Sequence, residues 1–182
     1  MRVHITYAGG TIGMVDSPEG LRPGADLVGW FGSQLEGIDV ASKVTMSTLE
    51  PLIDSSEATP EDWQAIVDDI NAHAEDADAF LVLHGTDTMA YSAAALSFAL
   101  AHLDKPVVLT GSQCPLGVVG SDASANVAGA LLGAASRRAR GVMLFFGHEL
   151  LAGNRATKAS SWAFGGFASP CASPVARVGA PW

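Results

Sequence analysis

The feature that most constrains this fold is an unbroken apolar run, Phe80-Leu81-Val82-Leu83, that stops at His84-Gly85. A strand that is apolar on both faces must be covered on both faces, which is typical of a central strand in a parallel sheet. Residues 106–110 and 141–146 repeat the pattern, and stretches with helical spacing separate the three runs. Strands that alternate with helices predict βαβ units and a mostly parallel sheet.

The rest of the chain extends this alternation. Residues 59–62, Thr-Pro-Glu-Asp, have the form of a helix start, because they offer an N-cap hydroxyl, a proline at the first position and acidic first-turn residues. After residue 146 glycine and proline become frequent, and we expect a loop-rich tail from about residue 159 and one hairpin around residues 152–154. The remaining predicted elements are strands over residues 3–8 and 44–49 and helices from residue 60, over 89–103 and over 121–136.

The length of 182 residues favours one domain. No internal repeat is visible, so we predict a single α/β domain over residues 1–182. Its expected form is a three-layer sandwich with a mostly parallel sheet of the Rossmann or flavodoxin type. Alanine and glycine dominate residues 121–136, which permits close packing of that helix on the sheet.

The charge balance limits the partners of this chain. Ten basic against 19 acidic side chains give a net charge of −9, which disfavours nucleic acid, because phosphate neutralisation needs clustered basic side chains. The one basic run, residues 137–140, follows an apolar helical pattern and is interpreted as cations at a helix C-terminus. The most apolar helical stretch, residues 89–103, falls short of the roughly 20 residues that a membrane span requires, so no membrane partner is predicted.

Cysteine is scarce. Cys114 and Cys171 each lie beside a proline and have no partner at metal-ligand spacing. No signal-peptide pattern opens the sequence. We therefore predict two ordinary thiols, a reducing compartment and a cytoplasmic location.

Polar and glycine residues follow four of the predicted strands. In an open parallel sheet, ligands bind beyond the carboxyl ends of the strands, so these segments are candidate site residues. They contain no metal-ligand cluster and no phosphate-binding loop, which disfavours a metal and a nucleotide cofactor and favours hydroxyl nucleophiles. The segments are Gly9-Gly10-Thr11-Ile12-Gly13, Asp54-Ser55-Ser56, His84-Gly85-Thr86-Asp87-Thr88 and Gly111-Ser112-Gln113.

Each of these residues also has a simpler structural interpretation when it is taken alone. Thr11 and Thr86 could cap helical turns, Asp87 could complement a helix dipole, and Lys158 could be a solvated surface lysine. His84 is more often a hydrogen-bonded structural histidine than a catalytic base. Two glycine-flanked threonine loops at strand ends, together with an acidic residue, favour a functional site over separate caps.

Residues 8–13, Ala-Gly-Gly-Thr-Ile-Gly, and residues 84–91, His-Gly-Thr-Asp-Thr-Met-Ala-Tyr, closely resemble the two signature motifs of bacterial L-asparaginases. The resemblance runs from Met1 to about Pro174 in the order of the family. Further stretches resemble the cytoplasmic, type I branch: residues 51–56, 59–63, 105–113 and 153–158.

The resemblance implies a hydrolase that converts L-asparagine and water into L-aspartate and ammonia without a cofactor. By position, Thr11 matches the primary nucleophile of the family, and Thr86, Asp87 and Lys158 match its second Thr-Asp-Lys group. The residues that the resemblance assigns to substrate binding are Gly10, Asp54, Ser55, Ser56 and Ser112, the last through its backbone carbonyl.

The chemistry suits these residue types. A threonine hydroxyl is a weak nucleophile unless a base or a polarising network activates it. Our hypothesis is acyl transfer to Thr11, release of ammonia, and hydrolysis by water activated through Thr86 and Lys158. Backbone N–H groups near the two threonines would stabilise the oxyanion, a contribution of about 3–4 kcal/mol in other enzymes.

The sequence departs from the family pattern in three ways. Ala8 stands where the family usually has threonine, and Leu21 stands near the place of a loop tyrosine, since no tyrosine occurs between Thr11 and Tyr91. The family usually carries a smaller C-terminal domain, through which a neighbouring subunit completes the site. We therefore expect a short-chain type I member, with an excised N-terminal domain as the alternative, that binds L-asparagine weakly. The helix rich in alanine and glycine and the loop-rich tail are expected to form the face of a homodimer or a higher homo-oligomer.

Two alternatives stay open. One is another amidase or an ammonia-donating amidotransferase component, which a preference for glutamine or a required partner would reveal. The other is an inactive module that binds aspartate or asparagine without turnover.

Overall fold

The computed structural model describes residues 1–35, 43–136 and 139–179. Its centre is a seven-stranded sheet with the order β11-β8-β7-β6-β5-β1-β4. The pairs from β4 through β7 are parallel, whereas β8 runs antiparallel to both of its neighbours. The strands of this sheet are β1 (Arg2–Tyr7), β4 (Lys43–Thr48), β5 (Ala79–Leu83), β6 (Val107–Thr110), β7 (Val142–Phe146), β8 (Glu149–Ala152) and β11 (Ala176–Arg177).

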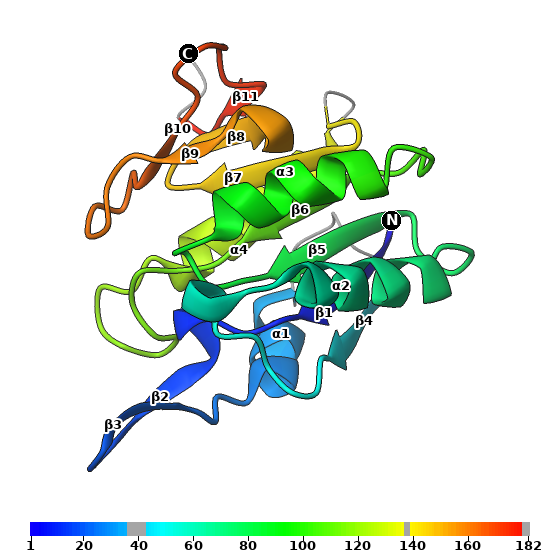
Figure 1. Ribbon diagram of the computed structural model, residues 1–182. Helices are drawn as coiled ribbons and strands as arrows, with labels where there is room; N and C mark the ends of the chain where they lie inside the picture. Colours follow the sequence, from blue (N-terminus) through cyan, green and yellow to red (C-terminus); the bar gives the residue numbers. More distant parts are fainter. Residues whose placement is uncertain (36–42, 137–138, 180–182) are drawn as a thin grey trace.

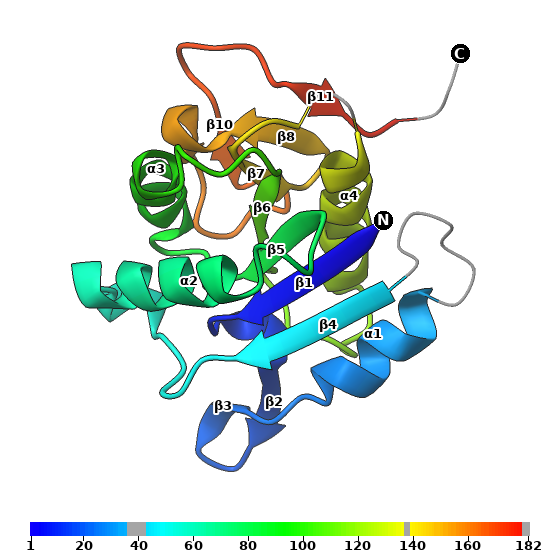
Figure 2. The same ribbon diagram turned by 90° about the vertical axis from the view of Figure 1, so that its right-hand side faces the viewer.

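Helices cover both faces of the sheet, as Figures 1 and 2 show. One face carries α2 (Pro60–Ala72) and α3 (Met89–Ala99), and the other carries α1 (Leu27–Leu35) and α4 (Ala123–Ala135). The prediction of a three-layer α/β sandwich with a mostly parallel sheet is confirmed.

The apolar run that opened the sequence argument is buried along its whole length. Phe80 and Val82 of β5 pack into the core on the α2 and α3 side, while Leu81 and Leu83 pack on the α1 and α4 side. Their side chains are fully buried, because alternate residues of a strand point to opposite faces of the sheet.

Small residues let α4 approach the sheet closely. A Cβ added at Gly129 would lie 2.0 Å from Cζ of the Phe145 ring on β7. The expectation of close packing by this helix is confirmed, and a larger residue at Gly129 would push α4 off the sheet.

The predicted start of α2 is confirmed in detail. Thr59 is the N-cap and Pro60 is the first helical residue. The Asp62 carboxylate accepts hydrogen bonds from both Thr59 N (2.8 Å) and Thr59 Oγ1 (3.0 Å), so these two residues satisfy each other across the first turn.

Two predicted boundaries are wrong. The helix predicted over residues 89–103 ends at Ala99, and tighter turns follow it, with hydrogen bonds from Ala101 N to Phe98 O and from Leu103 N to Leu100 O. The hairpin predicted around residues 152–154 lies earlier, between β7 and β8, where Gly147 has a φ of 62°. A φ in that region favours glycine, so the turn forms there, and Gly153–Arg155 instead forms a single 3-10 turn.

Several short elements were not predicted. A hairpin of β2 (Met14–Ser17) and β3 (Gly20–Pro23) projects from the body (Figure 1), and α1 follows it. The tail expected to be loop-rich contains the strand β10 (Phe167–Ala168), which pairs with β9 (Thr157–Lys158) just before the tail. Of the basic run at residues 137–140, Arg137 and Arg138 lie outside the described residues.

In the part of the chain that the structure describes, no helix is both long enough and apolar enough to cross a membrane.

A polar cluster joins α2 to the edge of the sheet formed by β1 and β4. The Asp69 carboxylate accepts hydrogen bonds from Thr6 Oγ1 (2.5 Å) and Ser47 Oγ (2.7 Å). His4 Nε2 lies 3.2 Å from the same carboxylate. Burial raises the pKa of Asp69, but the hydrogen bonds from His4, Thr6 and Ser47 together outweigh it and lower the pKa to about 2.

We expect Asp69 to make the fold sensitive to acid. Because the folded pKa is below the unfolded value of 3.8, the stabilisation is present above about pH 4 and is lost as the pH falls toward 2. The shift corresponds to about 2 kcal/mol of unfolding free energy. Urea unfolding between pH 6 and pH 2 should show that the difference in unfolding free energy between wild type and Asp69→Asn becomes smaller as the pH falls from about 4 toward 2.

The matched control is Asp78→Asn, because the Asp78 pKa is also lowered to about 2. Its ion pair with Arg2 is about half exposed, so its effect should be smaller and sensitive to salt. A difference between wild type and Asp69→Asn that stays constant from pH 6 to pH 2 would contradict this account.

Candidate active site

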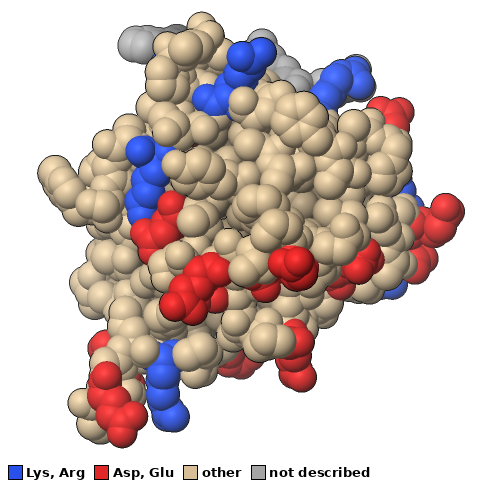
Figure 3. Space-filling view, in the orientation of Figure 1, with Lys and Arg blue, Asp and Glu red and all other residues tan. Residues whose placement is uncertain are grey.

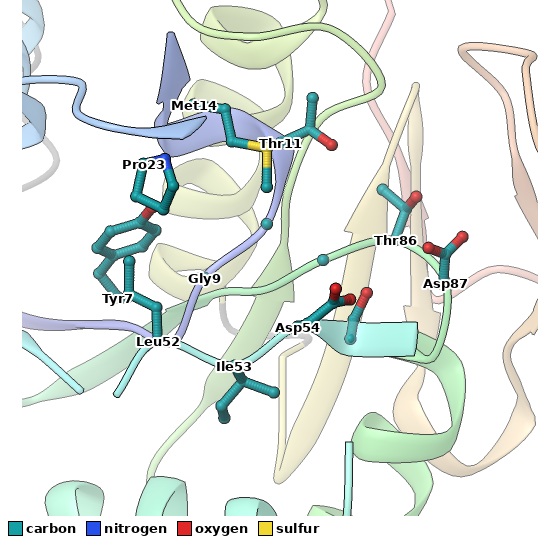
Figure 4. Close-up of a pocket in the computed structure, with 13 residues that line it drawn as sticks. Tyr7, Gly9, Thr11, Met14, Pro23, Leu52, Ile53, Asp54, Thr86 and Asp87 are labelled. Atoms are coloured by element: carbon teal, nitrogen blue, oxygen red, sulfur yellow. The ribbon is translucent and has the colours of Figure 1, made fainter. Parts of the chain in front are cut away.

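A pocket of about 280 Å³ opens at the carboxyl ends of β1 and β5. This volume is near the lower end of the range for ligand pockets, roughly 300–1,000 Å³, and suits a small molecule. Figure 4 shows Thr11 at the top of the pocket, Thr86 and Asp87 to its right, and Asp54 below them. The lining residues are Tyr7, Gly9, Gly10, Thr11, Met14, Pro23, Leu52, Ile53, Asp54, Ser55, Gly85, Thr86 and Asp87.

Thr11 is placed by the turn that follows β1. It begins a 3-10 turn, Thr11–Gly13, after Gly10, whose φ is 95°. A Cβ added at Gly10 would lie 2.5 Å from Gly85 N, so the two threonine loops touch backbone to backbone. Thr11 Oγ1 makes no hydrogen bond to any residue that the structure describes, and it faces the open pocket.

The second threonine belongs to a hydrogen-bonded group of three residues. Lys158 Nζ lies 3.0 Å from Thr86 Oγ1 and 2.8 Å from Asp87 Oδ1. The lysine side chain is 16% exposed and the aspartate side chain is 63% exposed. Lys158 therefore presents a largely buried cation to the Thr86 hydroxyl, which favours loss of the hydroxyl proton.

Gln113 completes this group, and the sequence prediction did not assign it a role. Its Nε2 donates to Ala163 O (3.1 Å), which leaves Oε1 facing the Thr86 hydroxyl at 3.5 Å. The Gln113 backbone is held in turn, because its N–H donates to the Asp122 carboxylate at 3.0 Å. Its position directly after β6 was the available signal, but the direction of a side chain cannot be read from sequence.

The loop after β4 supplies the acidic side of the pocket. Asp54 Oδ1 accepts hydrogen bonds from Ser56 N (2.9 Å) and Ser56 Oγ (2.8 Å), which lower the pKa of Asp54 and keep it ionised. Ser55 is buried, and its carbonyl accepts a hydrogen bond from Thr88 Oγ1 at 2.6 Å. An ionised carboxylate held in this way can bind a ligand's ammonium group.

Only some of the nine predicted site residues line the pocket. Lys158 reaches the site through Thr86 and Asp87 rather than by lining the pocket. Ser56 is exposed beside Asp54, and Ser112 is buried with its hydroxyl donating to Cys114 O (2.6 Å), so neither lines the pocket. The predicted residues that do line it are Gly10, Thr11, Asp54, Ser55, Thr86 and Asp87.

The apolar wall of the pocket was also missed. Tyr7, the last residue of β1, is buried beneath the turn that carries Thr11, and burial raises its pKa. Met14 and Pro23 come from the β2–β3 hairpin. Turn-forming residues at 16–20, Asp-Ser-Pro-Glu-Gly, were the signal for this hairpin.

In the described part of the chain, one group of side chains could offer ligands to a metal, and it lies in the polar cluster around Asp69 rather than in the pocket. The candidate ligand atoms of His4, Asp69 and His73 lie within 4.8 Å of one another. The two imidazole rings are stacked, however, with centroids 3.7 Å apart and planes 12° apart. Lone pairs in parallel planes do not converge on one ion, so this group does not fit a metal as it stands.

Acidic side chains gather over α2 on the face shown in Figure 3, whereas basic side chains lie singly. Among the described residues, this face shows no cluster of the basic side chains that binding a phosphate backbone requires.

Known proteins are similar to this chain in sequence and in fold. The family model described as asparaginase, N-terminal, matches residues 2–181. L-asparaginase 1 of Escherichia coli K12 is 46% identical over 97% of this chain and 53% of that protein. The structure of L-asparaginase I from Vibrio cholerae superposes with a TM-score of 0.86 and 40% identity, over 98% of this chain and 54% of that one.

Another relative is the human 60 kDa lysophospholipase, which is 37% identical over 98% of this chain and 35% of that protein. The chain spans about half the length of these two L-asparaginases. It belongs to the asparaginase family and corresponds to the N-terminal domain of that family.

Proposed function

We propose that the chain is an L-asparagine amidohydrolase that uses Thr11 as its nucleophile. The observation that carries this proposal is the Lys158-Thr86-Asp87 group, which lies across one small pocket from the Thr11 hydroxyl. A hydroxyl nucleophile on one side and a hydroxyl polarised by a cation on the other suit a two-step acyl transfer.

In the first step, Thr11 Oγ1 attacks the side-chain amide carbon of L-asparagine. The carbon–nitrogen bond breaks, the hydroxyl proton leaves with the amide nitrogen as ammonia, and an aspartyl ester forms on Thr11. Backbone N–H groups beside Thr11 and Thr86 bind the oxyanion. In the second step, water activated through Thr86 and Lys158 attacks the ester, L-aspartate leaves, and Thr11 regains its proton.

The α-amino and α-carboxylate groups of the substrate bind at the loop of Asp54, Ser55 and Ser56, and the carbonyl of Ser112 approaches the amide. The Asp54 and Asp87 side chains are exposed, and water competes with ligands for an exposed carboxylate. Weak affinity for L-asparagine follows, and a submicromolar KM would contradict it. We further propose that the chain works in the cytoplasm as a homodimer or a higher homo-oligomer, without a cofactor.

The test is ammonia release from L-asparagine and L-glutamine by the purified chain, with Lys158→Met alongside. Loss of the lysine removes the cation at 3.0 Å from Thr86 Oγ1, and we expect kcat to fall about 10²-fold, within the range of a lost general acid–base group. The matched control is Lys43→Met, because Lys43 is an exposed lysine at the start of β4, and it should leave kcat unchanged.

Other outcomes have distinct meanings. Equal release by wild type and Lys158→Met would exclude the role given to Lys158. A preference for glutamine would identify another amidase or an amidotransferase component. Binding of aspartate by calorimetry with no ammonia from either amide would identify a binding module instead.

A further inference from the structure

His84 is a buried histidine that the proposed chemistry does not use. It follows β5 and is 1% exposed, and both of its ring nitrogens are hydrogen-bonded. Nδ1 lies 2.8 Å from Gly85 O, and Nε2 lies 3.0 Å from Ser92 Oγ. Ser92 Oγ in turn accepts a hydrogen bond from Trp63 Nε1 at 2.9 Å. The four residues link α2 and α3 to the loop that carries Thr86.

Only one arrangement of protons fits this chain of hydrogen bonds. A carbonyl oxygen can only accept, so His84 Nδ1 carries the proton that Gly85 O receives. Burial lowers the pKa of His84 and keeps the ring neutral, so Nε2 accepts from the Ser92 hydroxyl. The Ser92 oxygen is then free to accept from the indole of Trp63, which can only donate. The donors and acceptors therefore follow one another in a single order, from Trp63 through Ser92 and His84 to the Gly85 carbonyl, and we call this chain of hydrogen bonds the relay.

The relay determines where the next peptide group points. The Gly85 carbonyl is drawn toward the buried imidazole. In a trans peptide the N–H lies opposite the carbonyl, so the Thr86 N–H points away from the ring. Gly85 and Thr86 both line the pocket, and no described residue accepts a hydrogen bond from the Thr86 N–H.

We infer that His84 is a positioning residue, which the Gly85 carbonyl and the Ser92 hydroxyl hold in its Nδ1–H tautomer so that the Thr86 N–H faces the substrate amide. This inference rests on the proposed function, in which that N–H binds the oxyanion. Loss of this positioning should therefore lower kcat rather than raise KM, because the oxyanion forms only after the nucleophile has attacked.

The kinetic test compares His84→Leu with His84→Asn. The leucine variant has no donor for Gly85 O, and we expect kcat to fall about 10- to 100-fold while KM changes less than about 3-fold. Asparagine can place an N–H near the position of Nδ1 and should recover kcat to within about 5-fold of wild type. The matched control is Thr110→Val, which loses a buried hydrogen bond of 2.9 Å to Phe145 O at the end of the neighbouring strand. It should keep kcat even where it lowers Tm.

A second test does not depend on turnover. The imidazole ¹⁵N shifts of His84 should report a protonated Nδ1 and a bare Nε2 at neutral pH. Ser92→Ala removes the hydroxyl that donates to Nε2, so the Nε2 shift should move, while the Gly85 carbonyl keeps Nδ1 protonated. Addition of L-aspartate should shift the Thr86 amide resonance in wild type and His84→Asn but not in His84→Leu.

The outcomes separate this inference from the proposed function. An Nε2–H tautomer in wild type, or equal losses of kcat in His84→Leu and Thr110→Val, would overturn the positioning role. Absence of ammonia release by wild type would overturn the proposed function, and the tautomer and the aspartate-induced shift would then decide the inference.

Discussion

Thr11→Val is expected to reduce ammonia release from L-asparagine by about 10³-fold or more. Valine has the shape of threonine but no hydroxyl, so the variant lacks the nucleophile while the pocket keeps its volume. Thr11 Oγ1 makes no hydrogen bond to a described residue, so the unfolding free energy should change by less than about 1 kcal/mol. The measurements are steady-state kcat, Tm and aspartate binding on the same preparation.

Thr86→Val is the informative companion, because Thr86 and Thr11 have different proposed roles. Without the Thr86 hydroxyl, which lies 3.0 Å from Lys158 Nζ, the acyl-enzyme on Thr11 should form but hydrolyse slowly. Rapid-quench assays should then show a burst of up to one ammonia per chain, and mass spectrometry should detect an aspartyl adduct. Thr11→Val should show neither. A burst in Thr11→Val with none in Thr86→Val would reverse the assignment of the two steps.

The parallel part of the main sheet was predictable because its strands carry their own signals. Continuous apolar runs end at glycines in β5 and β6, and such runs are buried on both faces whatever the rest of the chain does. The short strands β8, β9, β10 and β11 span two to four residues each, and they exist because a partner strand lies beside them. Pairing of this kind depends on tertiary structure, which is why the hairpin around residues 152–154 was misplaced.

The pocket residues also divide into those with a local sequence signal and those that depend on tertiary structure. Parallel topology brings the ends of β1 and β5 to one edge of the sheet, so the convergence of Thr11 and Thr86 could be expected from the strand pattern. Lys158 lies 72 residues after Thr86, and no local signal links the two, so only the family resemblance suggested it. Gln113 belonged to a candidate segment but was given no role, and Tyr7 was missed, because both roles depend on side-chain direction and on the fold of neighbouring loops.

The second large effect is predicted at Gly10, where the two threonine loops are in contact. Gly10→Ala should destabilise the fold by about 3 kcal/mol or more and should also reduce kcat. The residue has a φ of 95°, which costs alanine of order 1 kcal/mol or more. Its Cβ would also lie 2.5 Å from Gly85 N and 2.6 Å from Gly85 Cα. Backbone atoms cannot move aside as a flexible side chain can, so the loops must separate.

Gly20→Ala separates the two causes, since Gly20 has a φ of 108° but would place its Cβ in open space. We expect it to cost about 1 kcal/mol from backbone strain alone, with kcat unchanged. Separation of the Gly10 and Gly85 loops moves Thr11 relative to Thr86, and a displacement of about 1 Å at reacting groups can lower a rate about 10²-fold. If urea unfolding gave equal destabilisation for Gly10→Ala and Gly20→Ala, strain rather than loop contact would be the cause. Loss of kcat only at Gly10 would mean that the distance between the two threonines is set by this glycine contact.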